Sequence, residues 1–148
     1  MGKTLFKFES HSEGETVSFA RELAGELVSG DIMLLHGDLG MGKTVLARAL
    51  IRCLCGDNDI EVPSPTFTLV QTYDADVGGI WHFDLYRLCN PEEVYEIGWE
   101  EALNKGAGIA LVEWPERLDY LLPERALNVT LSAVDGQPNA RNIEVTRS

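Results

Sequence analysis

The feature that most constrains this chain is a glycine-rich segment at residues 37–44, which reads Gly-Asp-Leu-Gly-Met-Gly-Lys-Thr. Its glycines allow a tight backbone turn, and its spacing matches the phosphate-binding pattern G-x-x-x-x-G-K-[ST]. An apolar segment of strand length, residues 32–35, precedes it, and residues 45–54 after it have a helical pattern. A strand, a glycine loop and a helix in this order form a P-loop, so the sequence predicts a nucleoside triphosphate site.

The chemistry expected of this loop follows from its backbone and its last two side chains. Consecutive N–H groups and the start of the following helix form a nest for anions. Lys43 is expected to reach the outer phosphates, and the Thr44 hydroxyl to ligate Mg²⁺. The residues expected to bind the nucleotide here are Asp38, Leu39, Gly40, Met41, Gly42, Lys43, Thr44 and Val45.

A carboxylate that could ligate the metal together with the Thr44 hydroxyl is expected at the end of the apolar run Ile109–Glu113. Such a run is typical of a buried parallel strand, and ligands in open α/β sheets bind at the carboxyl ends of strands. Glu113 is therefore predicted to hold Mg²⁺ opposite Thr44; the alternative is a surface acid that leaves a strand. Trp114 follows directly and is predicted beside the site, where it stacks on a base or only packs.

Two segments rich in β-branched and aromatic residues, 67–73 and 80–86, predict an antiparallel hairpin with a longish loop. Asp84 near the end of its second strand is a candidate to hold a metal-bound water or to position an attacking one. His82 lies on the same strand face, so a His-x-Asp metal pair and a hydrogen-bonded structural histidine are both open.

A proline-rich stretch, Pro63-Ser64-Pro65, breaks regular structure before Thr66. The Thr66 hydroxyl either faces the γ-phosphate, as switch-loop residues do in nucleotide hydrolases, or belongs to a rigid turn before a strand. Thr16 and Arg141 are also candidates to contact the nucleotide, although the segment around Thr16 also fits an ordinary amphipathic helix. Thr16 lies in a helix with two possible capping boxes at its start and Gly30 as its expected end, and Arg141 opens the last strand.

The order of elements predicts an α/β P-loop fold with a mostly parallel central sheet, antiparallel hairpin additions and helices on both faces. One addition is the predicted hairpin of residues 127–131 and 142–146. A helix start is predicted at Asn90-Pro91, ending near Gly98. The length of 148 residues is typical of one domain, so we expect a single domain over residues 1–148.

The charge balance limits the partners of this chain. It has 24 acidic residues against 12 Lys and Arg, a formal net charge of −12. Because this surface repels phosphate backbones, any role in nucleic-acid chemistry is expected to act through a partner protein. No apolar run approaches 18 residues, which speaks against a membrane span. Three cysteines and no secretory leader favour a reducing interior, and hence the cytoplasm.

Four motifs occur in one order along the chain: Gly37–Thr44, Ser64-Pro65-Thr66-Phe67, His82-Phe83-Asp84-Leu85-Tyr86-Arg87 and Glu113-Trp114-Pro115-Glu116. As a set they resemble the bacterial TsaE family, also called YjeE, over nearly the whole chain. The resemblance implies an ATPase needed for threonylcarbamoyl modification of the adenosine next to the tRNA anticodon, acting with the proteins TsaD and TsaB. The resemblance further implies that TsaD carries the transfer chemistry and that ATP hydrolysis by this chain resets the complex between turnovers.

The resemblance also implies roles for individual residues. Thr44 and Glu113 would ligate Mg²⁺, Lys43 would hold phosphates, Asp84 would be essential for hydrolysis, and Thr66 would lie in a switch-like loop. The remaining nucleotide contacts implied by the resemblance are Thr16, Trp114 and Arg141.

Three alternatives remain open from the sequence. A small-molecule P-loop kinase or a nucleotide-dependent switch protein would share the P-loop, although no arginine-rich lid typical of a kinase is visible. A GTPase is disfavoured because Asn104-Lys105-Gly106-Ala107 lacks the Asp of a guanine-reading Asn-Lys-x-Asp motif. ATP with Mg²⁺ is therefore the expected ligand.

Overall fold

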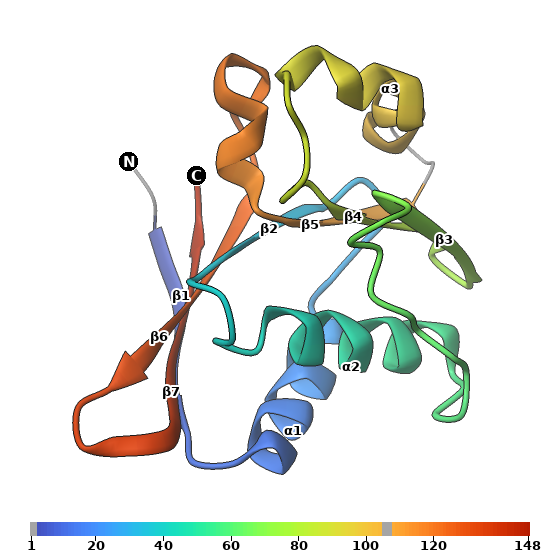
Figure 1. Cartoon of the computed structure of the whole chain (residues 1–148). Coiled ribbons are helices and arrows are strands. Elements are labelled where there is room, and N and C mark those ends of the chain that lie inside the picture. The colour runs from blue at the N-terminus through green and yellow to red at the C-terminus, as the bar shows by residue number, and fades with distance from the viewer. Residues whose placement is uncertain (1–2, 105–107) are drawn as a thin grey trace.

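Seven strands form one sheet in the structure, a computed structural model that describes residues 3–104 and 108–148. In chain order the strands are β1 (Lys3–Ser10), β2 (Ile32–His36), β3 (Val70–Ala75), β4 (Gly78–Asp84), β5 (Gly108–Glu113), β6 (Leu127–Val134) and β7 (Gln137–Arg147). Their order across the sheet is β1-β7-β6-β2-β5-β4-β3, with the strand before the P-loop, β2, in the middle (Figure 1).

The sheet is mixed rather than mostly parallel. The central strands β6, β2, β5 and β4 pair in parallel, whereas β3, β7 and β1 are added by antiparallel pairings. The expected hairpin of the tail is present, but its first strand, β6, also pairs in parallel with β2. The tail hairpin is thus built into the sheet beside β2, and its own β6–β7 pairing and the pairing of β7 with β1 add the antiparallel part.

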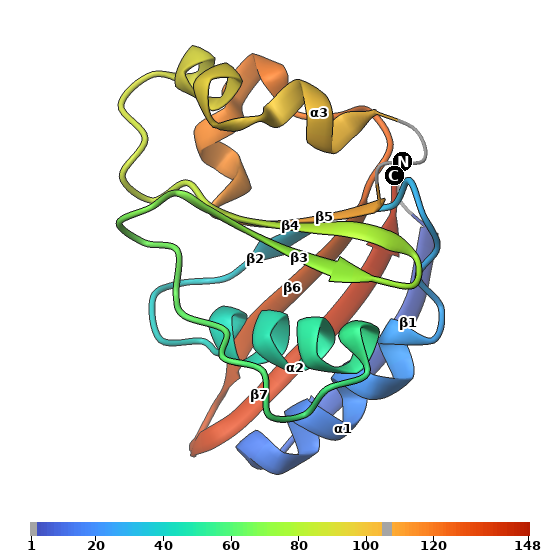
Figure 2. The ribbon, with the colours of Figure 1, turned by 90° about the vertical axis from the view of Figure 1, so that its right-hand side faces the viewer.

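Helices cover both faces of the sheet, as predicted. The α-helices α1 (Glu13–Ala24) and α2 (Lys43–Cys55) lie on one face. The 3₁₀ helix η1 (Pro91–Ile97), the short helix α3 (Trp99–Leu103) and the 3₁₀ helix η2 (Pro115–Leu121) lie on the other (Figures 1 and 2). Among the residues described, none of the helices has the length and apolarity needed to cross a bilayer.

Alternation along β4 and β5 fills two separate cores. Ile80 and Leu111 pack with α1 and α2, and their neighbours Phe83 and Val112 pack under α3 and η2 on the opposite face. Each strand is buried on both faces, as expected for parallel strands in the middle of an α/β sheet. This double burial fixes the strands that carry Asp84 and Glu113 at their ends.

Several boundaries differ from the expected ones. α1 ends at Ala24 rather than near Gly30, because the chain turns at Gly25 while Leu27 still packs into the core. The β3–β4 hairpin begins at Val70 and pairs Ala75 with Gly78, so its turn is short rather than longish. Phe67 lies in the preceding turn with 81% of its surface exposed. Residues 105–107, which belong to the segment Asn104-Lys105-Gly106-Ala107 that lacks the Asp of a guanine-reading motif, lie outside the described residues.

One backbone contact between β4 and β5 requires glycine. Gly108 faces Gly79 across the parallel pairing and has φ +131°, a conformation that L side chains rarely adopt. A Cβ added at Gly108 would lie 1.7 Å from the carbonyl oxygen of Gly79, which is far inside the van der Waals limit. The start of β5 therefore depends on glycine both for its dihedral angle and for its close approach.

We expect Gly108→Ala to lower the free energy of unfolding by about 2–6 kcal/mol, because backbone strain and the overlap with Gly79 each cost about 1–3 kcal/mol. Chemical denaturation measures the loss. Gly30→Ala is the matched control, since Gly30 has φ +100° but no atom within 4 Å of an added Cβ, so it tests the strain alone. Equal losses in the two variants would contradict the overlap.

Candidate functional site

The P-loop follows β2 and leads directly into α2, at the carboxyl ends of the central parallel strands. Gly42, the residue before the helix, has φ +100° and ψ 17°, a left-handed conformation that turns the loop into the helix. On the α2 face, the side chains of β4 and β5 change from apolar Ile80 and Leu111 to polar Asp84 and Glu113 as the strands approach the loop. Polar groups are thus gathered at the edge where ligands of α/β sheets bind.

Thr44 and Glu113, 69 positions apart in the sequence, are in direct contact. The Thr44 hydroxyl donates a hydrogen bond of 3.0 Å to Oε1 of Glu113, whose side chain is 2% exposed. A hydroxyl and one carboxylate oxygen fit Mg²⁺, which takes one or two protein ligands and completes its octahedron with phosphate oxygens and water. The described residues contain no cluster of three or more His, Cys, Asp or Glu that could form a protein cage for a metal.

His82 is a member of this cluster whose partner the sequence did not reveal. Its Nε2 lies 2.6 Å from Oε2 of Glu113, and the side chain has no exposed surface. Of the two roles left open by the sequence, the structure shows the hydrogen-bonded histidine, with Glu113 as its partner. The signal available was the shared strand face of His82 and Asp84, but only the pairing of β4 with β5 identifies Glu113 as its partner.

Asp84 and Thr66 also meet. The Thr66 hydroxyl donates to Oδ2 of Asp84 at 3.1 Å, and the backbone N–H of Tyr86 donates to Oδ1 at 3.0 Å. Asp84 is 4% exposed, so solvent competes little for the two oxygens that these donors orient. A carboxylate fixed in this way can accept a proton or orient a water molecule without first having to order itself.

Lys43 lies between the P-loop and Trp114. Its ammonium donates to the carbonyl of Gly37 and, at 3.5 Å, to that of Asp38, and it stands 3.6 Å from the centroid of the Trp114 ring. Trp114 has φ 58°, which is rare for a large side chain and brings its ring over the lysine. Burial lowers the pKa of Lys43, and nearby carboxylates, Glu113 first among them, oppose that shift.

These side chains surround a cavity of about 300 Å³, which we call the carboxylate pocket. Its walls come from the P-loop, the first turn of α2, the segment before β3 and the ends of β4 and β5. The residues that line it are Leu39, Gly40, Met41, Gly42, Lys43, Thr44, Val45, Thr66, Asp84, Glu113 and Trp114.

A second cavity, of about 360 Å³, lies on the other side of the P-loop and is called the arginine pocket here. It is lined by His11, Ser12, Glu13, Thr16, Gly40, Met41, Gly42, Val45, Asn139 and Arg141. Four residues, Gly40, Met41, Gly42 and Val45, line both pockets, so the loop runs between them. The two cavities together have the size expected of a small-molecule site.

Arg141 attaches the last strand to the P-loop. Its Nε donates to the carbonyl of Met41 at 3.2 Å and its Nη2 to that of Gly40 at 3.3 Å. Its Nη1 donates to the carbonyls of Pro138 and Ala140, each at 2.8 Å. The guanidinium therefore orients the loop backbone from β7, and it does so at the edge of the arginine pocket.

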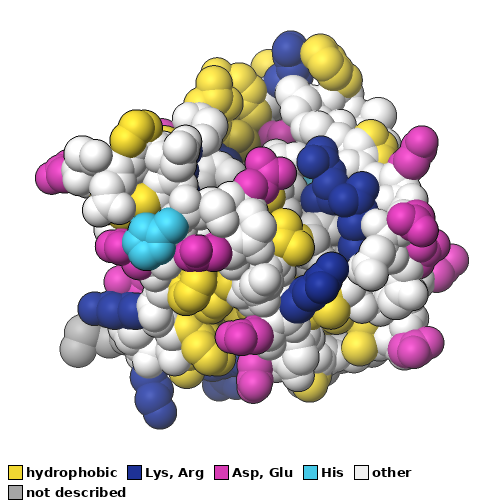
Figure 3. Space-filling model, turned by 90° about the horizontal axis from the view of Figure 1, so that it is seen from below, with side chains coloured by type: hydrophobic (Ala, Val, Ile, Leu, Met, Phe, Trp, Pro, Cys, Tyr) yellow, Lys and Arg dark blue, Asp and Glu magenta, His cyan; other side chains and the backbone are white. Residues whose placement is uncertain are grey.

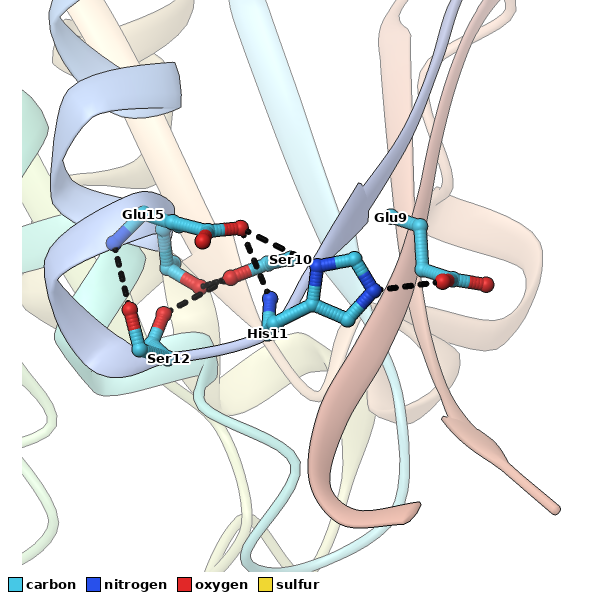
Figure 4. A network of polar contacts seen from close by, with 6 residues as sticks. Glu9, Ser10, His11, Ser12 and Glu15 are labelled. Atoms are coloured by element: carbon cyan, nitrogen blue, oxygen red, sulfur yellow. Dashed lines mark hydrogen bonds and ion pairs between the residues drawn. The ribbon is translucent and has the colours of Figure 1, made fainter. Parts of the chain in front are cut away.

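Thr16 belongs to a polar network at the start of α1. Its hydroxyl is 2.7 Å from that of Ser10, and Ser12 caps the helix by accepting the N–H of Glu15 at 3.1 Å. Figure 4 shows Glu9 and Glu15 on either side of His11, whose Nε2 is 2.6 Å from the Glu9 carboxylate. The hydrogen bond with Glu9 raises the pKa of His11. The capping motifs revealed this helix start, but not that it borders the loop.

The two pockets divide the predicted binding residues. Trp114 lies with Lys43 in the carboxylate pocket, and Thr16 and Arg141 lie in the arginine pocket. Asp38 lines neither pocket and contacts the site through its carbonyl, which accepts from Lys43. His11, Ser12, Glu13 and Asn139 were not predicted as site residues.

Known proteins resemble this chain in sequence and in structure. The sequence model of the family described as "Threonylcarbamoyl adenosine biosynthesis protein TsaE" matches residues 10–143. A TsaE protein of Rickettsia conorii is 49% identical over 84% of this chain and 70% of its own length, and one of Rickettsia bellii is 45% identical over 90% of each. A crystal structure of YdiB from Bacillus subtilis superimposes with a TM-score of 0.74 and 29% identity, covering 99% of this chain and 87% of that one. This chain belongs to the TsaE family.

Proposed function

We propose that this chain is a Mg²⁺-dependent ATPase that serves the threonylcarbamoyl modification of tRNA. Family membership supports the role in threonylcarbamoyladenosine biosynthesis. The observation that carries the ATPase assignment is the contact between Thr44 and Glu113 at the first turn of the P-loop helix. One sheet includes strands from Lys3 to Arg147, in keeping with one catalytic domain over the chain.

The electrostatics of the carboxylate pocket favour a nucleotide that arrives with a cation. Four carboxylates, those of Asp38, Asp84, Glu113 and Glu116, act on the Lys43 ammonium. The phosphate groups of a nucleotide without a cation would be repelled by this surplus of negative charge. A Mg²⁺ ion bound to the nucleotide would supply the neutralising charge and polarise the phosphate oxygens. Thr44 and Glu113 would hold that ion, while Lys43 exchanges its loop carbonyls for phosphate oxygens.

Asp84 and Thr66 are placed to act on the attacking water. The carboxylate is oriented by the Thr66 hydroxyl and the Tyr86 N–H, and it lines the same pocket as Thr44. We assign Asp84 the positioning of that water and Thr66 a place in a segment that responds to the γ-phosphate. The nucleoside would extend past the P-loop into the arginine pocket, toward Thr16 and Arg141.

Surface charge favours a role in which tRNA is reached through partner proteins. On the underside of the molecule, one group of Lys and Arg side chains lies right of centre, other Lys and Arg side chains stand apart from it, and Asp and Glu side chains are spread over the same face (Figure 3). The net charge of −12 repels an RNA backbone as a whole. We therefore propose that the chain acts in the cytoplasm on a complex of TsaD and TsaB. An arginine from a partner would accelerate ATP hydrolysis, an effect that reaches ~10³–10⁵-fold in other P-loop proteins.

Two other uses of the same residues are distinguished by their products. A small-molecule kinase would transfer the γ-phosphate to an acceptor, whereas an ATPase releases free phosphate. A nucleotide switch would bind ATP and change its partners without repeated turnover. The hydrogen bond between Thr66 and Asp84 would serve a switch as well, so turnover itself has to be measured.

Lys43→Ala is expected to lower ATP turnover by about 10²–10³-fold, the usual cost of removing a preorganised charge from a transition state. Thr44→Ala should abolish Mg²⁺-dependent turnover, and Thr44→Ser, which keeps the hydroxyl, should restore it. Release of inorganic phosphate measures both effects. Undiminished hydrolysis in Lys43→Ala or Thr44→Ala would refute the P-loop assignment.

Asp84→Ala is expected to bind ATP as the natural protein does and to lose hydrolysis by about 10²–10⁴-fold, the range for a group that handles a proton. Nucleotide affinity from calorimetry and phosphate release are compared in the same preparation. Asp76→Ala, in the exposed turn of the same hairpin, is the control and should change neither quantity. An equal loss of binding in Asp84→Ala would make Asp84 a structural residue.

The chain should raise the number of tRNA molecules modified per TsaD–TsaB complex when ATP is present. Lys43→Ala serves as the control, because it should fold and leave the complex at its basal turnover. Threonylcarbamoyladenosine formed over several turnovers is measured by mass spectrometry of digested tRNA. If the chain leaves multi-turnover modification unchanged, the assigned process is rejected.

A further inference from the structure

His82 is the buried titratable side chain that the proposed chemistry leaves without a task. It lies on β4, where its register partner on β5 is Leu111, and Asp84 is the partner of Glu113. His82 therefore reaches Glu113 across one diagonal step of the parallel pair, with 2.6 Å between Nε2 and Oε2. Because a carboxylate only accepts, the ring donates through Nε2.

The two oxygens of Glu113 have different partners. Oε2 accepts from His82, and Oε1 accepts from the Thr44 hydroxyl at 3.0 Å. The carboxylate is 2% exposed, so solvent does not compete for either oxygen. The bond from His82 thus fixes the orientation of the Glu113 carboxylate, with one oxygen turned toward Thr44.

The imidazole has a single hydrogen bond within the described part of the chain. Its Nδ1 is buried and has no partner there. A ring protonated at Nε2 alone needs no acceptor at Nδ1, whereas a proton at Nδ1 would be a buried donor left unpaired at a cost of about 1–3 kcal/mol. The surroundings therefore select the tautomer that donates to Glu113.

We propose that His82 is a positioning residue that presents Oε1 of Glu113 to the divalent cation of the bound nucleotide. This inference rests on the proposed function, in which Glu113 is a metal ligand. Hydrogen bonds to a ligating carboxylate fix its orientation, and losing such a bond costs roughly 10–100-fold in metal affinity. His82 contacts the metal ligand and not the reacting groups, so its effect is on metal affinity first.

Two amide substitutions separate positioning from simple packing. His82→Gln places an N–H donor near the position of Nε2, and His82→Asn places one near Nδ1, where the ring has no partner. The two variants are alike in polarity and differ in whether the donor reaches Glu113. A residue needed only for packing would not distinguish them by metal affinity.

The measurement is the Mn²⁺ dissociation constant of the protein in its stoichiometric complex with a non-hydrolysable ATP analogue, followed by the EPR signal of free Mn²⁺. His82→Asn should weaken Mn²⁺ binding by about 10–100-fold and His82→Gln should retain it. Nucleotide affinity in EDTA should be the same in both variants. The tautomer is read independently in the natural protein from ¹⁵N chemical shifts of the His82 ring, which should show a proton on Nε2.

Each outcome decides between the two roles. Natural Mn²⁺ affinity in His82→Asn overturns the inference and leaves the ATPase proposal intact. Parallel losses of Mn²⁺ and of metal-free nucleotide affinity in both variants also overturn it, in favour of packing. If neither variant folds, a proton on Nδ1 in the natural protein overturns it. Absence of Mn²⁺ binding to the natural complex would refute the metal site, and with it both proposals.

Discussion

The site depends on the hydrogen bonds made by the buried carboxylate of Glu113. An almost fully buried carboxylate is costly unless its oxygens are satisfied, and here each oxygen has one donor, Thr44 from the P-loop helix and His82 from β4. The three residues come from α2, β5 and β4, so their contact links the helix to two adjacent strands. The same contact sets the distance between the P-loop and the sheet edge where Asp84 ends its strand.

The parallel strands make this arrangement possible. Residues of β4 and β5 on one face pass from the apolar core to the pocket within four positions, from Ile80 to Asp84 and from Ile109 to Glu113. The apolar part anchors the polar part, because a strand buried on both faces cannot shift its register without exposing its core side chains. Rigid support of this kind is what a site needs when catalysis is mainly positioning.

Local spacing made part of the fold and of the site predictable from the sequence. The P-loop, its flanking strand and helix, the strand ending in Glu113 and the helices on both faces follow from motifs and apolar runs that act over a few residues. The contact of His82 with Glu113 and the position of Asn139 at the arginine pocket depend on how distant strands pair, which no local pattern encodes.

The β-branched and aromatic residues before Val70 led to a strand being predicted too early, because Phe67 is exposed in a turn. The sheet was predicted to be mostly parallel because nothing in the sequence indicates that β7 joins the same sheet through two antiparallel pairings, with β6 and with β1.

The attachment of Arg141 to the P-loop has a consequence for how the molecule is made. The carbonyl of Met41 and the guanidinium that holds it are 100 positions apart, and β7 also pairs with both β1 and β6. During synthesis the loop leaves the ribosome long before the strand that orients it, so a growing chain can form α2 well before it can form the finished site. The P-loop therefore reaches its final conformation only at the end of translation. A chain interrupted before β7 would have the glycine-rich motif without the Arg141 hydrogen bonds that orient it.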